Sequence, residues 1–269
     1  MPQRAAPMHA GTTPAMSAYE WNAGDAISRW QRGTLWSLLA AKHVDDLLAG
    51  FDDAQIARYS SAAGSATFNA FVADAARHGV GVELLLGDPS WIAPSGIPSL
   101  EAILHRLRAV RFAGLNLDLE PNEVRGRPIR AVLEDLARSM RAYVAYSPWP
   151  VTLDINDFYA GGKAAGGYCV MCELRDGGLR RVDLMTYVAD PPAVERIDRP
   201  IVSAYPSIRF QTAQSVEPPS VIPARDSYWS WGYARFYRAM RRLSVLTGAQ
   251  PNAGGIVVES LQYLESMKP

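Results

Sequence analysis

The sequence has few of the residues on which metal and redox chemistry most often depends. It contains 4 histidines and 2 cysteines in 269 residues. None of His9, His43, His78 and His105 has the spacing that would pair two ligands of one zinc ion. A metal-dependent hydrolase or phosphodiesterase is therefore disfavoured, and neither a metal nor another cofactor is expected. Lys+Arg and Asp+Glu both number 27, so no basic excess favours nucleic-acid binding.

Long hydrophobic runs are also missing. No stretch approaches the roughly 18 consecutive apolar residues of a membrane helix, so no membrane insertion is expected. Residues 1–20 are rich in Ala, Pro, Thr and Gly and lack the apolar centre of a signal peptide. They are predicted to be a disordered leader or linker. An export signal that had been removed would leave no trace, and such a protein would be periplasmic or secreted; the compartment and the oligomeric state stay open.

The two cysteines, Cys169 and Cys172, form a C-x-x-C sequence. Such a pair can be a redox pair, half of a zinc site, a local disulfide or two thiols in a turn or short helix. Zinc would need two further ligands that the scattered histidines do not supply. Two thiols and a disulfide remain as alternatives.

Short leucine-rich or β-branched runs alternate with helical patterns over residues 21–269, which is typical of βα units around a parallel sheet. We predict one (β/α)8 TIM-barrel domain over this range, with a doubly wound open sheet as the alternative. Only a weak candidate, residues 55–61, exists for a degenerate second strand, and the last helix is expected to be short. The other seven strands are predicted within residues 34–40, 80–86, 114–120, 151–157, 182–190, 199–208 and 254–260.

Polar and apolar residues alternate along two neighbouring predicted strands. Because side chains in a strand point alternately to its two faces, the polar ones share one face, the barrel interior. Three come from each strand: Asn116, Asp118 and Glu120 from one, and Thr152, Asp154 and Asn156 from the next. Clustered carboxylates raise one another's pKa, so that one can stay protonated near neutral pH and act as a general acid. A self-satisfied buried polar network is the alternative, but six such residues favour an active site.

Aromatic residues follow the predicted strands at the same end of the barrel. Trp91, Tyr159, Trp229 and Trp231 lie in loops there and offer flat apolar faces beside acids. Such surfaces stack on pyranose rings, so the loops favour a carbohydrate site.

The segment "AGLNLDLE", residues 113–120, resembles the D-G-x-D-x-D-x-E motif of chitinase-like glycoside hydrolases of family 18. Gly114, Asp118 and Glu120 match, while Ala113 and Asn116 stand where that family has aspartates. Later strands add to the resemblance. Met185 and Tyr187 match the family's M-x-Y segment, where Val188 replaces an acid or amide and Asp190 follows two residues later. Glu259 stands at the place of a tryptophan.

The longer segment "FAGLNLDLEP" is also similar to the F-D-G-I-H-L-D-x-E-P motif of poorly characterised, glycosidase-like bacterial barrel proteins. Their G-D-P-x-W stretch corresponds to residues 87–91. This likeness makes Asp88 and Trp91 candidate site residues.

These resemblances imply a glycoside hydrolase acting on a polysaccharide or oligosaccharide. Glu120 would protonate the glycosidic oxygen, supported by Asp118 and Tyr187. The mechanism would be substrate-assisted or would use a second carboxylate, with Glu259, Asp154 and Asp190 as candidates. A non-catalytic, lectin-like barrel is the alternative. The expected substrate-binding residues are Asn116, Asp88, Trp91, Asp154, Asn156, Asp190, Tyr205, Trp229, Trp231 and Glu259.

Overall fold

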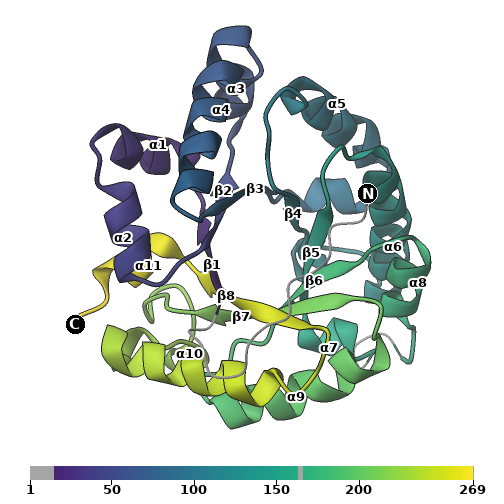
Figure 1. Ribbon diagram of the computed structural model, residues 1–269. Helices are drawn as coiled ribbons and strands as arrows, with labels where there is room; N and C mark the ends of the chain where they lie inside the picture. Colours follow the sequence, from purple (N-terminus) through teal and green to yellow (C-terminus); the bar gives the residue numbers. More distant parts are fainter. Residues whose placement is uncertain (1–14, 163–165, 269) are drawn as a thin grey trace.

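A computed structural model describes residues 15–162 and 166–268, and within them eight parallel strands form a closed barrel. Each strand pairs with the strand that follows it in the sequence, and the last pairs with the first (Figure 1). The predicted (β/α)8 TIM barrel is therefore confirmed. The strands are β1 (Met16–Glu20), β2 (Asp46–Gly50), β3 (Gly81–Leu86), β4 (Leu115–Asp118), β5 (Val151–Asn156), β6 (Arg181–Met185), β7 (Arg209–Ser215) and β8 (Ala253–Glu259).

Helices surround the strand ring on its outside (Figure 1). The final helix has 6 residues, as expected from the sequence, and packs against β8 and β1. The helices are α1 (Ala23–Gln31), α2 (Leu35–Ala41), α3 (Asp53–Tyr59), α4 (Ala62–Arg77), α5 (Ile97–Leu107), α6 (Ile129–Tyr146), α7 (Asp157–Ala160), α8 (Val170–Asp176), α9 (Pro191–Ala204), α10 (Tyr233–Thr247) and α11 (Leu261–Ser266). No helix in the described residues is long and apolar enough to span a bilayer.

The two faces of the strands bury different kinds of side chain. Leu115, Leu117 and Leu119 belong to the large core between strands and helices. A second, small apolar cluster, which includes Tyr19, Leu48 and Met185, lies inside the barrel. The other inward positions are largely polar, although the interior of such a barrel is usually filled by branched apolar side chains.

Three sequence predictions of strand position were wrong, those at 34–40, 55–61 and 199–208. The first strand lies at Met16–Glu20, inside the predicted leader, and residues 1–14 of that leader lie outside the described residues. The predicted strand at 34–40 is mostly α2, because a short apolar run does not distinguish a buried helix from a strand. Residues 55–61 largely belong to α3 and the second strand precedes them. Residues 199–208 mostly continue α9, and β7 follows them.

Candidate active site

Carboxyl groups from two sides of the barrel gather at the carboxyl ends of its strands. Asp118 ends β4, with Glu120 two residues later, and Glu259 ends β8. Tyr187 follows β6 by two residues, so it keeps the inward face of Met185. Burial raises the pKa of Tyr187 well above its usual range, and the nearby charges on Glu259, Asp118, Asp154 and Glu120 raise it further. We call Asp118, Glu120, Tyr187 and Glu259 the mouth cluster.

Glu259 is held by Trp21, the residue directly after β1. The Trp21 indole nitrogen donates to Glu259 Oε1 at 2.6 Å, and the Trp21 ring stacks on Tyr19 with 5.8 Å between centroids. Burial raises the pKa of Glu259 to about 8, with the nearby Asp118, Glu217 and Glu120 charges adding to the rise and the Trp21 hydrogen bond opposing it. Glu259 is therefore largely protonated at neutral pH, with its Oε2 not engaged by Trp21.

The two acids of the β4 end are both half-buried but differ in how far their pKa values rise. Burial, followed by the Glu120 charge, raises the pKa of Asp118 to about 7. Glu120 is half-buried and Asn122 Nδ2 donates to its Oε2 at 3.2 Å. Burial raises the pKa of Glu120, and the Asn122 hydrogen bond acts in the opposite direction. The pKa of Glu120 rises less than those of Asp118 and Glu259. Glu120 is therefore the group best placed to carry a negative charge.

A layer of polar side chains lies directly beneath the mouth cluster. Asp118, Asp154 and Asp183 are register partners on β4, β5 and β6. Asn116 Nδ2 donates to Asp154 Oδ1 at 3.0 Å and to Asp183 Oδ2 at 2.9 Å. Asn116 is thus the neutral bridge between two buried acids. Asn156, which ends β5, keeps a buried Oδ1 without a hydrogen-bond partner in the described chain.

Several expected binding residues lie away from the mouth cluster. The Asp88 side chain accepts a hydrogen bond from the Ser90 backbone at 2.8 Å and caps the short 3-10 helix Pro89–Ile92. Trp91 is buried in the outer core rather than at the rim. Trp229 packs edge-on against Tyr263. Trp91 lies there because its loop folds inward against α6, where Tyr143 donates to the Trp91 carbonyl at 2.7 Å.

Two further expected residues have other surroundings. Trp231 carries the Arg235 guanidinium over its ring, 3.9 Å from the centroid. Asp190 is exposed at the start of α9, and its charge raises the pKa of Tyr228. The structure therefore brings together Asn116, Asp118, Glu120, Asp154, Asn156, Tyr187 and Glu259 from the expected set. Of the expected aromatics, Trp91 and Tyr159 are buried in the outer core, and Trp229 and Trp231 are partly buried against it.

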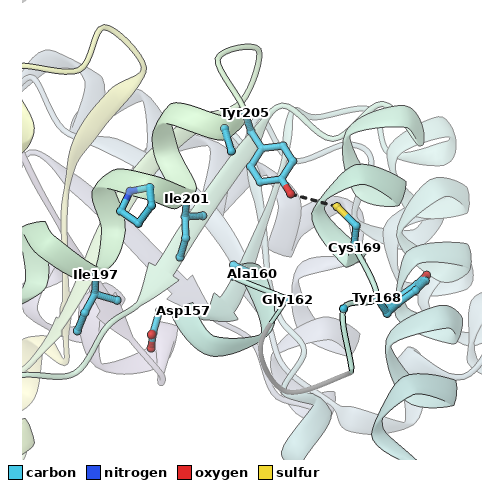
Figure 2. A pocket seen from close by; sticks show the side chains of 12 residues that line it. Asp157, Ala160, Gly162, Tyr168, Cys169, Ile197, Ile201 and Tyr205 are labelled. Carbon is cyan, nitrogen blue, oxygen red and sulfur yellow. Dashed lines mark hydrogen bonds between the residues drawn. The ribbon is translucent and has the colours of Figure 1, made fainter.

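Tyr205 belongs to a separate pocket of about 340 Å³ between α7 and α9 (Figure 2). Its hydroxyl lies 3.1 Å from Cys169 Sγ, and Cys169 is bonded to Cys172 in a disulfide. Ile197 and Ile201 of α9 line the opposite side of this pocket (Figure 2). The disulfide alternative for the C-x-x-C sequence is thus the one observed, and Tyr205 is not part of the mouth.

Sequence reasoning missed Trp21, Tyr19 and Asp183. Trp21 and Tyr19 escaped because β1 was assigned to the leader. Asp183 is inward-facing on a strand that was predicted, but its partnership with Asp154 depends on strand register. Among the described residues, no three His, Cys, Asp or Glu side chains are arranged to hold a metal ion.

Comparison with known proteins adds the following. No family model and no curated protein matches the sequence. Among solved structures, 3-keto-D-glucoside 4-epimerase from E. coli is similar with a TM-score of 0.52 and 10% identity, over 92% of each chain. Phosphonopyruvate hydrolase in complex with oxalate and Mg²⁺ has a TM-score of 0.49 and 9% identity, over 94% of this chain and 77% of that one. Phosphoenolpyruvate phosphomutase from Streptomyces platensis subsp. rosaceus has a TM-score of 0.48 and 14% identity, over 97% and 79%.

The predicted family 18 glycosidase is wrong: no family model matches the sequence, and the similar structure with a TM-score above 0.5 is an epimerase. The predicted glycoside hydrolase function, its lectin-like alternative and the predicted carbohydrate partner are therefore wrong as well. The structure gives a physical reason. Asn116, at a motif aspartate, is a buried bridge between acids, and Glu259, at the motif tryptophan, is a buried acid rather than a flat platform. The similarity itself, at these identities, establishes the barrel fold alone.

The raised pKa values make the stability of the barrel depend on pH. A carboxyl whose pKa is higher in the folded state binds protons more readily there, so its contribution is complete below the unfolded pKa and is lost as pH rises through the folded pKa. We expect the free energy of unfolding to fall between pH 5 and pH 8, by about 1.4 kcal/mol per pH unit for each proton retained. The carboxyls responsible are Asp46 and Glu259, with pKa values of about 8, and Asp118, Asp183, Asp198 and Glu20, with values of about 7.

Urea unfolding at several pH values measures this slope. A free energy of unfolding that is constant or rises from pH 5 to pH 8 would contradict the assignment of protons to these buried acids.

Proposed function

We propose that this barrel is an acid–base enzyme that removes a proton from a carbon next to a carbonyl group in an uncharged small molecule. The observation that carries the proposal is the pairing of a buried, protonated acid with a more exposed carboxylate at one barrel mouth. Glu259 has a pKa of about 8, and Glu120 lies in the same cluster with less burial. Environments that separate the pKa values of two neighbouring acids assign one as acid and one as base.

The roles follow from the contacts. Glu120, as carboxylate, accepts the proton, and the electron pair of the broken C–H bond forms the carbon–carbon double bond of an enol. Glu259 donates its proton to the carbonyl oxygen. A carboxylic acid kept neutral near pH 7 and a tyrosine hydroxyl together can stabilise such a developing oxyanion. Tyr187, whose pKa burial and the surrounding carboxyls raise well above its usual range, stays protonated and supplies the second hydrogen bond.

The reaction class is isomerisation, epimerisation or elimination. Return of the proton to a neighbouring carbon or to the other face gives an isomer, and loss of a leaving group from the next carbon gives elimination. Neither outcome needs an oxidant or a reductant.

The charge of the site favours an uncharged substrate. In the described part of the chain, the main causes of the pKa shifts of Asp118, Glu120, Tyr187 and Glu259 are burial, carboxyl charges and hydrogen bonds, with no Arg, Lys or His among them. An anionic substrate would meet acids without a cation to pair with, which is unfavourable in a partly buried site.

Deuterium exchange tests the proposal. Hydroxyacetone and dihydroxyacetone, as uncharged α-hydroxy ketones, are incubated with the protein in D₂O, and loss of the α-proton signals is followed by proton NMR. Enzyme-dependent exchange is expected for the wild type, with a loss of about 10²-fold or more in Glu120→Gln, since a general base contributes about 10²–10⁴-fold. Glu123→Gln, an exposed neighbour, is the matched control. Equal exchange in the wild type and Glu120→Gln, or no exchange with either ketone, would count against the proposal.

The rate of that exchange is expected to depend on pH with a bell shape. The rising limb follows ionisation of Glu120, and the falling limb follows loss of the Glu259 proton at about pH 8. Asp118 raises the pKa of Glu259 by its charge, so Asp118→Asn should move the falling limb to lower pH. Profiles of kcat/KM against pH for both proteins check this. A falling limb that stays in place in Asp118→Asn would contradict the coupling.

A further inference from the structure

A second opening lies at the other end of the barrel. A hollow of about 500 Å³ is lined by residues at or near the starts of the strands, among them Asp45, Asp46, Gly81, Arg181 and Arg209. The mouth cluster is at the strand ends, so the barrel interior separates the two openings. Asp46 and Arg181 face both this hollow and the interior, since burial and then the Glu83 and Asp183 charges raise the pKa of Asp46, and Arg181 Nη2 donates to Glu83 Oε1.

A continuous series of acids crosses the interior between these openings. Asp118, Asp154 and Asp183 are register partners on neighbouring strands. Burial raises the pKa of Asp46, Asp183 and Asp154, and neighbouring charges add to the rise: that of Glu83 at Asp46 and Asp183, and those of Asp183 and Asp118 at Asp154. Asn116 bridges Asp154 and Asp183 by two hydrogen bonds. We call Asp46, Glu83, Asp183, Asp154 and Asp118 the acid column. It begins at the hollow and ends in the mouth cluster.

The backbone is shaped to admit this column. A Cβ atom on Gly81 would lie 2.5 Å from Asp46 Oδ1, and one on Gly114 would lie 2.6 Å from the Glu83 carboxyl. Two strands therefore lack side chains where the column needs space. The interior of such a barrel is usually filled by apolar side chains. Acids in their place destabilise the barrel unless protonation and hydrogen bonds compensate for their burial.

The column also has free proton-accepting atoms. Asp46 Oδ1, Glu83 Oε2, Asp154 Oδ2 and Asp118 Oδ1 are buried, and no group in the described chain hydrogen-bonds to them. Asp154 and Asp183 are almost entirely inaccessible, at 0% and 2% exposure. Burial raises the pKa of Asp183 to about 7 and that of Asp46 to about 8, so both exchange protons near neutral pH rather than holding or lacking them permanently.

We infer that the acid column is a proton path that joins the mouth cluster to solvent at the opposite end of the barrel. A proton enters at Asp46, and each acid passes one proton to the next, so that one proton reaches the mouth cluster for each one taken up. The path lets the mouth acids regain protons while a substrate covers the mouth. This role of the path rests on the proposed function.

The test needs no substrate, so its failure is distinguishable from failure of the proposed function. In Asp118→Asn, the column is cut at the mouth, and deuterium must reach Asp183 from the hollow. This protein is mixed rapidly into D₂O at pH 6, and the deuteration of Asp183 is followed over time by infrared spectroscopy. The protonated-carboxyl band of Asp183 is identified as the band that disappears when Asp183→Asn is added.

Adding Asp46→Asn or Glu83→Gln is expected to slow deuteration of Asp183 by tenfold or more. Asp45→Asn is the matched control, because Asp45 lines the same hollow but its Oδ1 accepts from the Met16 backbone at 3.0 Å. Asp46→Asn preserves volume and covers the case in which Glu83→Gln, which leaves Arg181 unpaired, fails to fold. Slowing of less than tenfold in the folded variants, equal slowing in Asp45→Asn, or an Asp183 that is ionised at pH 6 would overturn the inference.

Discussion

Replacing Glu259 by glutamine is expected to lower kcat for α-proton exchange by about 10²–10⁴-fold, the usual contribution of a general acid. Glutamine keeps the size of the side chain and can still accept the 2.6 Å hydrogen bond from Trp21. It cannot release a proton to the carbonyl oxygen. The falling limb of the pH profile should therefore disappear together with the activity, while KM changes little.

Glu217→Gln is the control for this substitution. Glu217 is near enough to raise the pKa of Glu259 by its charge, and Ser215 donates to it, but it has no role in the proposed proton transfer. A Glu259→Gln protein that folds normally and loses less than tenfold in kcat would contradict the role of Glu259 as the acid.

Replacing Asn116 by aspartate is expected to destabilise the barrel by about 3–5 kcal/mol at pH 7, the range seen when a buried charge loses compensation. Asn116 is fully buried and donates to both Asp154 and Asp183. An aspartate there supplies no amide protons and adds a third acid between two others. Its pKa would be raised by burial and by like charge.

The pH dependence identifies the cause of this loss. An acid with a raised folded-state pKa contributes stability that is present below the unfolded pKa of about 3.9 and is lost as pH rises. The deficit of Asn116→Asp should therefore be smaller at pH 5 than at pH 8. Urea unfolding at both values measures it, with Asn156→Asp at the strand end, where exposure is greater, as the milder control. A deficit equal at both pH values would contradict the electrostatic explanation.

The part of the site on β4 and β5 could be predicted from the sequence because the two-residue period is unbroken there. Asn116, Asp118 and Asp154 were placed inside the barrel from alternation alone, and the register pairing of Asp118 with Asp154 agrees with that placement. The pattern indicates which face a side chain occupies. It does not indicate which acid receives a hydrogen bond or how deeply each is buried.

The rest depended on tertiary structure. β1 is a five-residue strand that follows a sequence rich in Ala, Pro, Thr and Gly, so the sequence did not indicate that Trp21 lies beside Glu259. β7, with the sequence RFQTAQS, lacks an apolar run, whereas the apolar residues before it continue α9. The motif resemblance failed for a related reason, since matching residues at strand ends fix their position at the mouth but not the chemistry of their neighbours.

The protonation state of Glu259 tests most directly the assignment of Glu259 as the acid and Glu120 as the base. Carbon-13 NMR of protein labelled at the glutamate side-chain carboxyls, with the signal assigned by its loss in Glu259→Gln, gives the titration midpoint. We predict a midpoint near pH 8 for Glu259, against its ordinary value of 4.5, and a lower one for Glu120. A Glu259 midpoint near 4.5, with the carboxyl ionised at neutral pH, would contradict the assignment of acid and base.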